Sequence, residues 1–84
     1  MNIDNLVTMA NQIGTFFASY PDPQEGRTEI ANHLQRFWAP RMRSRLFSHI
    51  DETEGEGLNP MVIEALLEHR REHMPPPPPG GDAG

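Results

Sequence analysis

Prolines at four places divide this chain into segments that each carry a helical spacing of apolar residues. Pro23, Pro40 and Pro60 suit the first position of a helix, where the missing amide proton costs nothing, and Pro75 ends the last periodic segment. Proline also disfavours the helical conformation of the residue before it, so the second helix should end near Trp38 and the third should begin at Pro40. We therefore predict an all-α protein, a small bundle of three to four short helices.

Each segment has an apolar face that repeats every three or four residues. We expect Asp22 and Asn59 to cap the second and fourth helices. Gly14 interrupts the first face at a cost of about 1 kcal/mol relative to alanine, which indicates either a tolerated imperfection or the close approach of another helix. The residues expected to face inward are, in chain order, Leu6, Met9, Ala10, Ile13, Phe16, Phe17 and Tyr20, then Ile30, Ala31, Leu34, Phe37 and Trp38, then Met42, Leu46, Phe47 and Ile50, then Val62, Ile63, Leu66 and Leu67.

Two stretches lack an apolar face. Residues 51–57 form an acidic loop that we expect to be too polar and too rich in glycine to pack. We expect the fourth helix to end at Met74, so that the helical domain covers residues 1–74. Residues 75–84 then form a disordered, Pro/Gly-rich C-terminal tail, which begins as a polyproline segment.

Composition limits the kind of protein this is. A chain of 84 residues buries only about 60% of its unfolded surface, so its core is marginal and should depend on a partner. The absence of cysteine excludes disulfides and thiolate metal sites. No apolar run approaches the roughly 20 residues that span a bilayer, and the N-terminus lacks the basic region of a signal peptide. We expect a cytoplasmic protein that binds no membrane and forms a homo-oligomer when its partner is absent.

Few residues suggest catalysis or metal binding. His69 and His73 are four residues apart, a spacing at which two imidazoles can share a metal ion, but the chain offers no clear third ligand. The better interpretation is a solvated helix end with a favourable dipole interaction. No serine or threonine has the context of a nucleophile, and no glycine-rich phosphate loop is present. We predict that the chain has no catalytic residues, no metal site and no enzymatic activity.

The segment around Pro40 is the best candidate for binding. It combines the only tryptophan with four arginines in a chain whose net charge is −5. The arginines are solvated and paired with Asp51, Glu52 and Glu54, or they form a protein-docking patch, or they hold a phosphate-bearing ligand. We do not expect the chain to bind nucleic acid. Four arginines in an acidic chain would release few counterions from duplex DNA, so the electrostatic gain in binding would be small. The candidate interaction residues are Phe37, Trp38, Pro40, Arg41, Met42 and Arg43, and the weaker candidates for cofactor binding are Arg36, Arg41, Arg43 and Arg45.

Four blocks of sequence together resemble a known family. They are Met9–Phe17, Arg36–Arg43, His49–Asp51 and Gly55–Val62, and their order and spacing cover roughly residues 5 to 70. In these blocks the chain is similar to the delta subunit of NAD-dependent, molybdenum-containing formate dehydrogenases.

This resemblance implies a non-catalytic accessory subunit. In that family a large alpha subunit holds a bis-molybdopterin guanine dinucleotide cofactor and iron–sulfur clusters, and beta and gamma subunits carry electrons to NAD through flavin. The delta subunit has no redox centre, and the resemblance implies that it aids assembly, stability or cofactor loading of the alpha subunit. The alternative is a cofactor-handling chaperone that binds guanine nucleotide or pyrophosphate through its arginines.

Overall fold

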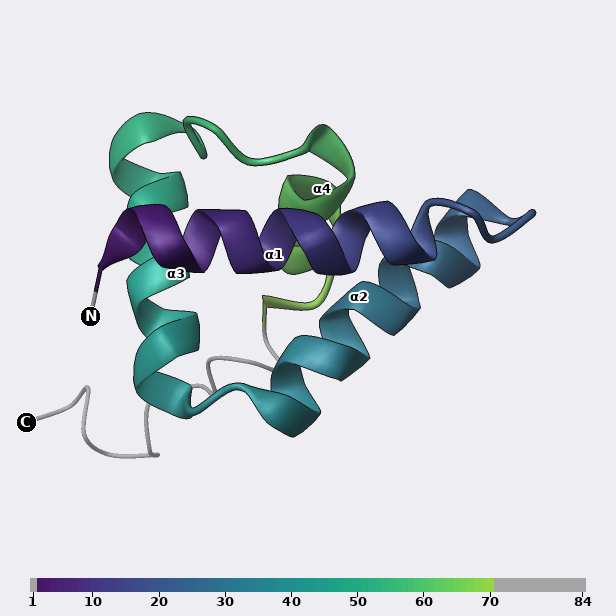
Figure 1. Cartoon of the computed structure of the whole chain (residues 1–84), viewed down its shortest axis with the longest axis horizontal. Helices are drawn as coiled ribbons and strands as arrows, with labels where there is room; N and C mark the ends of the chain where they lie inside the picture. Colours follow the sequence, from purple (N-terminus) through teal and green to yellow (C-terminus); the bar gives the residue numbers. More distant parts are fainter. Residues whose placement is uncertain (1, 71–84) are drawn as a thin grey trace, which may run out of the picture.

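The computed structural model describes residues 2–70, which form four helices and no strand. The helices are α1 (Ile3–Phe17), α2 (Pro23–Phe37), α3 (Pro40–Thr53) and α4 (Pro60–Glu68) (Figure 1). The predicted all-α class is therefore confirmed. The proposed tail, residues 75–84, lies outside the described residues.

Prolines and capping residues fix where the helices begin. The Asp22 carboxylate accepts a hydrogen bond from the Gln24 amide at 3.0 Å, and Pro23 follows at the first helical position. Asn59 precedes α4 as expected, but its side chain makes no capping hydrogen bond. Trp38 and Ala39 are extended between α2 and α3, as the effect of Pro40 on the preceding residue predicts.

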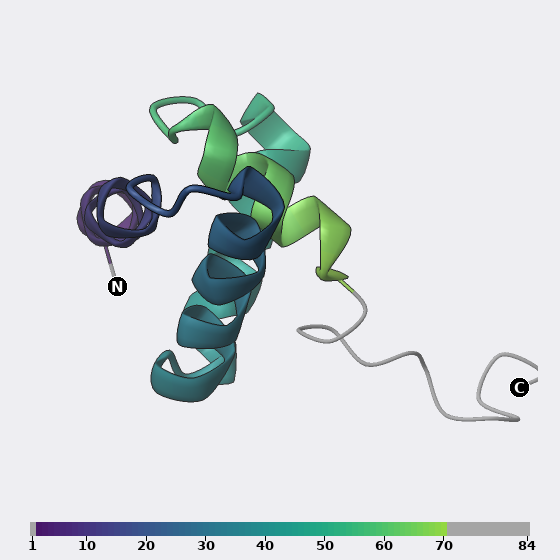
Figure 2. The same ribbon diagram turned by 90° about the vertical axis from the view of Figure 1, so that its right-hand side faces the viewer.

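Helix α1 lies across the other three helices and contacts each of them. The view in Figure 2 shows α1 nearly end-on, with α2, α3 and α4 grouped to one side of it. The core fills the space between them, and its largest fully buried side chains are Phe47, Ile30, Leu34, Leu46, Leu66 and Val62. This core agrees with most of the predicted inward faces.

Four residues expected in the core are instead on the surface. Phe37 and Phe16 are 67% and 66% exposed, and Leu67 and Met9 are 50% and 40% exposed. Each belongs to an apolar stripe that is wider than the face its neighbours cover. The prediction that they face inward was wrong for this reason.

Gly14, a buried residue of α1, allows α4 to pack closely against this helix. An ideal Cβ at Gly14 would lie 2.6 Å from Cγ2 of the buried Val62 side chain, which is too close for any real side chain. Of the two interpretations of Gly14, the close approach of another helix is therefore confirmed.

Residues 51–53, expected to belong to an acidic loop, form the end of α3 instead. The loop that follows them packs, contrary to the prediction. Gly55 is buried with a φ of 81°, a Cβ added to it would lie only 2.7 Å from Cδ1 of Ile63, and Leu58 is 7% exposed. The loop is held to α1 by Asn11, whose side-chain amide donates to the Gly57 carbonyl at 2.9 Å and accepts from the Asn59 amide at 2.8 Å. The polar composition of the loop gave no sign of this packing. The side chain that anchors the loop, Asn11, lies far from it in the sequence.

Replacing Asn11 with alanine should lower the free energy of unfolding by about 1 kcal/mol, since two loop backbone groups lose their partner near the surface, where water replaces it in part. Asn5→Ala is the matched control, because Asn5 is exposed on the same helix. Urea unfolding followed by circular dichroism measures both variants. Equal midpoints for the two would contradict a role for Asn11 in holding the loop.

The last residue of α4 is Glu68, with His69 as its C-cap. The predicted end of the helical segment at Met74 lies outside the described residues. Two ion pairs connect this end to the rest of the molecule, Arg27 with Glu68 at 3.0 Å and Arg70 with Asp51 at 2.7 Å. The hydrogen bond from Arg70 lowers the pKa of the Asp51 carboxyl from its ordinary value of 3.8. Within residues 2–70, no helix is both long and apolar enough to cross a membrane.

Candidate protein-docking surface

An open apolar pocket lies between α1 and α2. The two helices meet at the turn that follows Phe17 and diverge toward α3 (Figure 1). The pocket between them has a volume of about 460 Å³. Its walls come from α1 through Met9, Gln12, Ile13, Phe16 and Phe17, and from the α2 side through His33 and Trp38.

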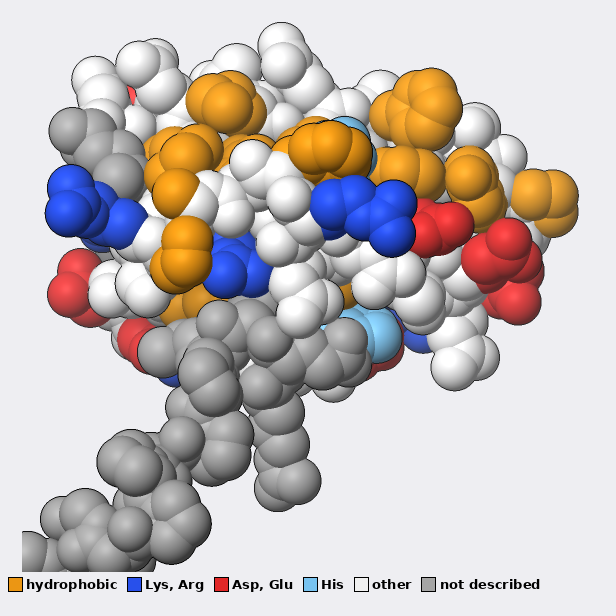
Figure 3. Space-filling view, turned by 90° about the horizontal axis from the view of Figure 1, so that it is seen from below, with side chains coloured by type: hydrophobic (Ala, Val, Ile, Leu, Met, Phe, Trp, Pro, Cys, Tyr) orange, Lys and Arg blue, Asp and Glu red, His pale blue; other side chains and the backbone are white. Residues whose placement is uncertain are grey.

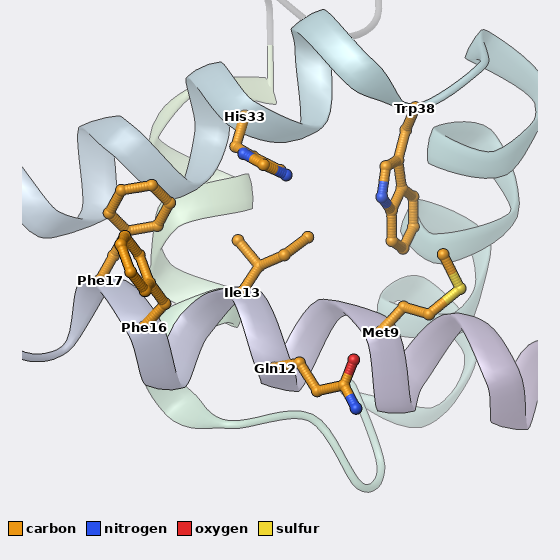
Figure 4. A pocket seen from close by; sticks show the side chains of 7 residues that line it. All are labelled: Met9, Gln12, Ile13, Phe16, Phe17, His33 and Trp38. Atoms are coloured by element: carbon orange, nitrogen blue, oxygen red, sulfur yellow. The ribbon is translucent and has the colours of Figure 1, made fainter.

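Trp38 lines one wall of this pocket, although nearly all of its side chain is buried. Its side chain belongs to the core cluster and is only 6% exposed. In Figure 4 the indole ring extends from the end of α2 toward Met9 on α1, and His33 points toward Ile13. Because the backbone of Trp38 has left the helix, with φ of −92° and ψ of 140°, its ring does not continue the outer surface of α2. The expected docking tryptophan is therefore mainly a core residue.

Aromatic rings form a rim beside the pocket. Phe16 and Phe17 pack edge to face with centroids 4.9 Å apart, and His33 lies 6.1 Å from Phe17 and 4.7 Å from Phe37. Phe16 and Phe37 are the most exposed large apolar side chains in the described part of the chain. Hydrophobic side chains gather in a band on this side of the molecule, with arginine side chains among them (Figure 3). Sequence reasoning missed Phe16 as a surface residue, because helical spacing alone placed it in the core.

The four arginines do not form one cluster. Arg41 and Arg45 are four residues apart and share a face of α3, whereas Arg43 lies between them in sequence and so points to the opposite side. Arg43 reaches α2, where its Nη1 donates to the Gln35 carbonyl at 3.3 Å, and its buried Nε has no hydrogen-bond partner. Arg36 is exposed near the end of α2.

The expected pairing of these arginines with Asp51, Glu52 and Glu54 is not observed among residues 2–70. Asp51 pairs with Arg70 instead. Among residues 2–70, no carboxylate forms an ion pair with Arg36, Arg41 or Arg45. Two further candidate interaction residues differ in exposure. Pro40 is exposed, whereas Met42 is partly buried against the core.

The histidines have structural surroundings. His49 Nε2 lies 2.7 Å from the Glu56 carbonyl oxygen, which ties α3 to the loop that follows it. His69 is the C-cap of α4, and His73 lies outside the described residues, so the structure does not test their pairing. The described residues contain no group of three side chains suited to hold a metal ion. The pocket between α1 and α2 and the exposed phenylalanine rings beside it are therefore suited to binding apolar groups.

The chain matches a known protein family. The family described as the NADH-dependent formate dehydrogenase delta subunit, FdsD, matches residues 5–66. The matched range contains every residue that lines the pocket between α1 and α2. Searches of curated proteins and of solved structures found no match.

Proposed function

The chain belongs to the delta subunit family of NADH-dependent formate dehydrogenases, and from this premise we propose that it is a non-catalytic accessory subunit that docks on the alpha subunit. In this proposal it aids the assembly, stability or molybdenum-cofactor loading of that subunit in the cytoplasm. It binds no cofactor firmly itself. The bis-molybdopterin guanine dinucleotide and the iron–sulfur clusters belong to its partner, and through that partner it joins the beta and gamma subunits.

The observation that carries this proposal is the apolar surface between α1 and α2. Two phenylalanines that are about two-thirds exposed flank an open pocket of about 460 Å³. Contiguous apolar surface on a small protein marks an interaction site, and aromatic residues are enriched at protein interfaces. A marginal core gains stability when a partner covers such a surface, because binding to the folded state alone favours folding.

Pull-down of the alpha subunit tests this proposal. The chain is used as bait in cells that make the molybdenum cofactor and in cells that cannot. Equal capture in both supports an accessory subunit whose docking is independent of cofactor status. Capture only of the cofactor-free alpha subunit supports a function in cofactor loading. Failure to capture the alpha subunit in either strain would contradict the proposal.

A second candidate function is the handling of a guanine nucleotide or pyrophosphate by the arginines. It is favoured by the lack of carboxylate partners for Arg36, Arg41 and Arg45 within the described chain. Guanidinium groups bind phosphate oxygens through charge-assisted hydrogen bonds. Calorimetric titration with GDP should give heat that is lost in Arg41→Ala/Arg45→Ala and kept in Arg27→Ala, whose arginine is already paired with Glu68. No heat at millimolar GDP would exclude this candidate.

A further inference from the structure

We infer that the pocket between α1 and α2 is the docking site itself, and that it receives a partner segment combining apolar side chains with a carboxylate that binds Arg36. This inference rests on the proposed accessory function and adds the surface and the chemistry of the partner. It follows from the way three hollows connect, from the charge at one end of them, and from the exposed rings beside them.

The apolar pocket continues into a polar hollow along α2. The second hollow, of about 180 Å³, shares Phe17 and His33 with the apolar pocket and adds Arg36 and Phe37. A third, of about 330 Å³, shares Asn32 and Arg36 with the second. The surface is therefore a groove that is apolar between the helices and becomes polar and cationic toward Arg36.

The positive charge of Arg36 at the polar end of the groove favours an anionic group on the partner segment. Arg36 is exposed, and no carboxylate of the described chain forms an ion pair with it. Glu29 also lines the second hollow, but its Oε1 is directed to the side-chain amide of Asn32, 3.4 Å away. A carboxylate from a partner can bind the Arg36 guanidinium in bidentate fashion, which fixes the orientation of the segment that carries it.

The rings beside the groove favour a protein segment over a small molecule. A pocket of about 460 Å³ lies within the roughly 300–1,000 Å³ of small-ligand sites. Phe16 and Phe37, however, are about two-thirds exposed and extend the apolar surface beyond the pocket. An amphipathic helix laid in such a groove covers the rings and fills the pocket at once, as in other helix-in-groove complexes. The segment should thus present bulky apolar residues on one face with Asp or Glu beside them.

Capture of the alpha subunit by variants of the full chain tests this docking site. Three variants remove features of the groove: Phe16→Asp, Phe37→Asp and Arg36→Glu. Each should reduce capture of the alpha subunit at least tenfold, which is the effect expected for loss of a single hot-spot residue at an interface. The matched control is Leu67→Asp, which changes an exposed apolar residue on α4, and it should stay within twofold of wild type. Circular dichroism checks that each variant folds, which their exposure predicts.

The outcomes separate this inference from the proposed function. If wild-type chain captures no alpha subunit, both fail. If wild-type capture is normal and the three groove variants match it, the accessory function stands and the docking site is wrong. Loss of capture only in Leu67→Asp would move the site to α4 and overturn the inference. So would a wild-type dimer that Phe16→Asp dissociates without any change in capture, because a second copy of the chain would then occupy the groove.

Discussion

Trp38→Ala should lower the free energy of unfolding by about 3–5 kcal/mol, the usual cost of deleting a buried tryptophan. Trp38 is 6% exposed and joins the core at the point where α2 gives way to α3. A protein of 84 residues has roughly 4–13 kcal/mol of total stability, so the variant loses a large part of it. Urea unfolding followed by far-UV circular dichroism measures the loss without relying on tryptophan fluorescence, which the variant lacks.

Phe37→Ala is the control for this experiment. Phe37 is the adjacent aromatic residue, but it is 67% exposed, so its removal should change stability by less than about 0.5 kcal/mol. Equal stabilities of Trp38→Ala and wild type would contradict the placement of the indole ring in the core. Loss of complex formation by Trp38→Ala reports unfolding as much as docking, and for this reason the docking test uses Phe16 and Phe37.

The starts of the helices could be predicted from the sequence because they depend on local chemistry. Pro23, Pro40 and Pro60 each stand at the first position of a helix, as expected. The C-cap of α4 at His69 has no such local signal, since the sequence beyond Glu68 has no proline until Pro75.

The candidate surface was located only in part, because exposure depends on contacts between distant segments. Helical spacing placed Phe16 and Phe37 on apolar stripes, yet α1 and α2 diverge and leave the outer edge of each stripe uncovered. Trp38 was expected both on the inward face and as an interaction residue, and its ring lies in the core, where the backbone is extended before Pro40. The sequence therefore indicated the correct end of α2 for binding, while Phe16, on the other wall of the pocket, was assigned to the core.

The packed loop after α3 was missed for a related reason. Its anchor, Asn11, is 46 and 48 residues away from the two backbone groups it binds. A polar residue on the outer side of a helical pattern gives no sign of such a contact. Gly14 was different, because glycine in a helix is costly enough to suggest that something lies close to it.

That contact makes the effect of Gly14→Ala depend on Val62. In the wild-type background the new Cβ lies 2.6 Å from Cγ2 of Val62, a stiff and fully buried side chain that cannot easily move. Overpacking of this kind costs about 1–3 kcal/mol, and the better helix propensity of alanine returns about 1 kcal/mol. The net result should be a destabilisation of about 1 kcal/mol.

Removing the opposing methyl groups should reverse the sign. In a Val62→Ala background Cγ2 is absent, so Gly14→Ala keeps only its gain in helix propensity and should stabilise the protein by up to about 1 kcal/mol. A double-mutant cycle measured by urea unfolding should therefore give a coupling energy of about 2 kcal/mol between the two positions. Additive effects would mean that α1 and α4 do not approach each other at Gly14. Coupling of the expected sign would establish that this glycine sets the distance between α1 and α4, and with it the position of the helix that forms one wall of the pocket.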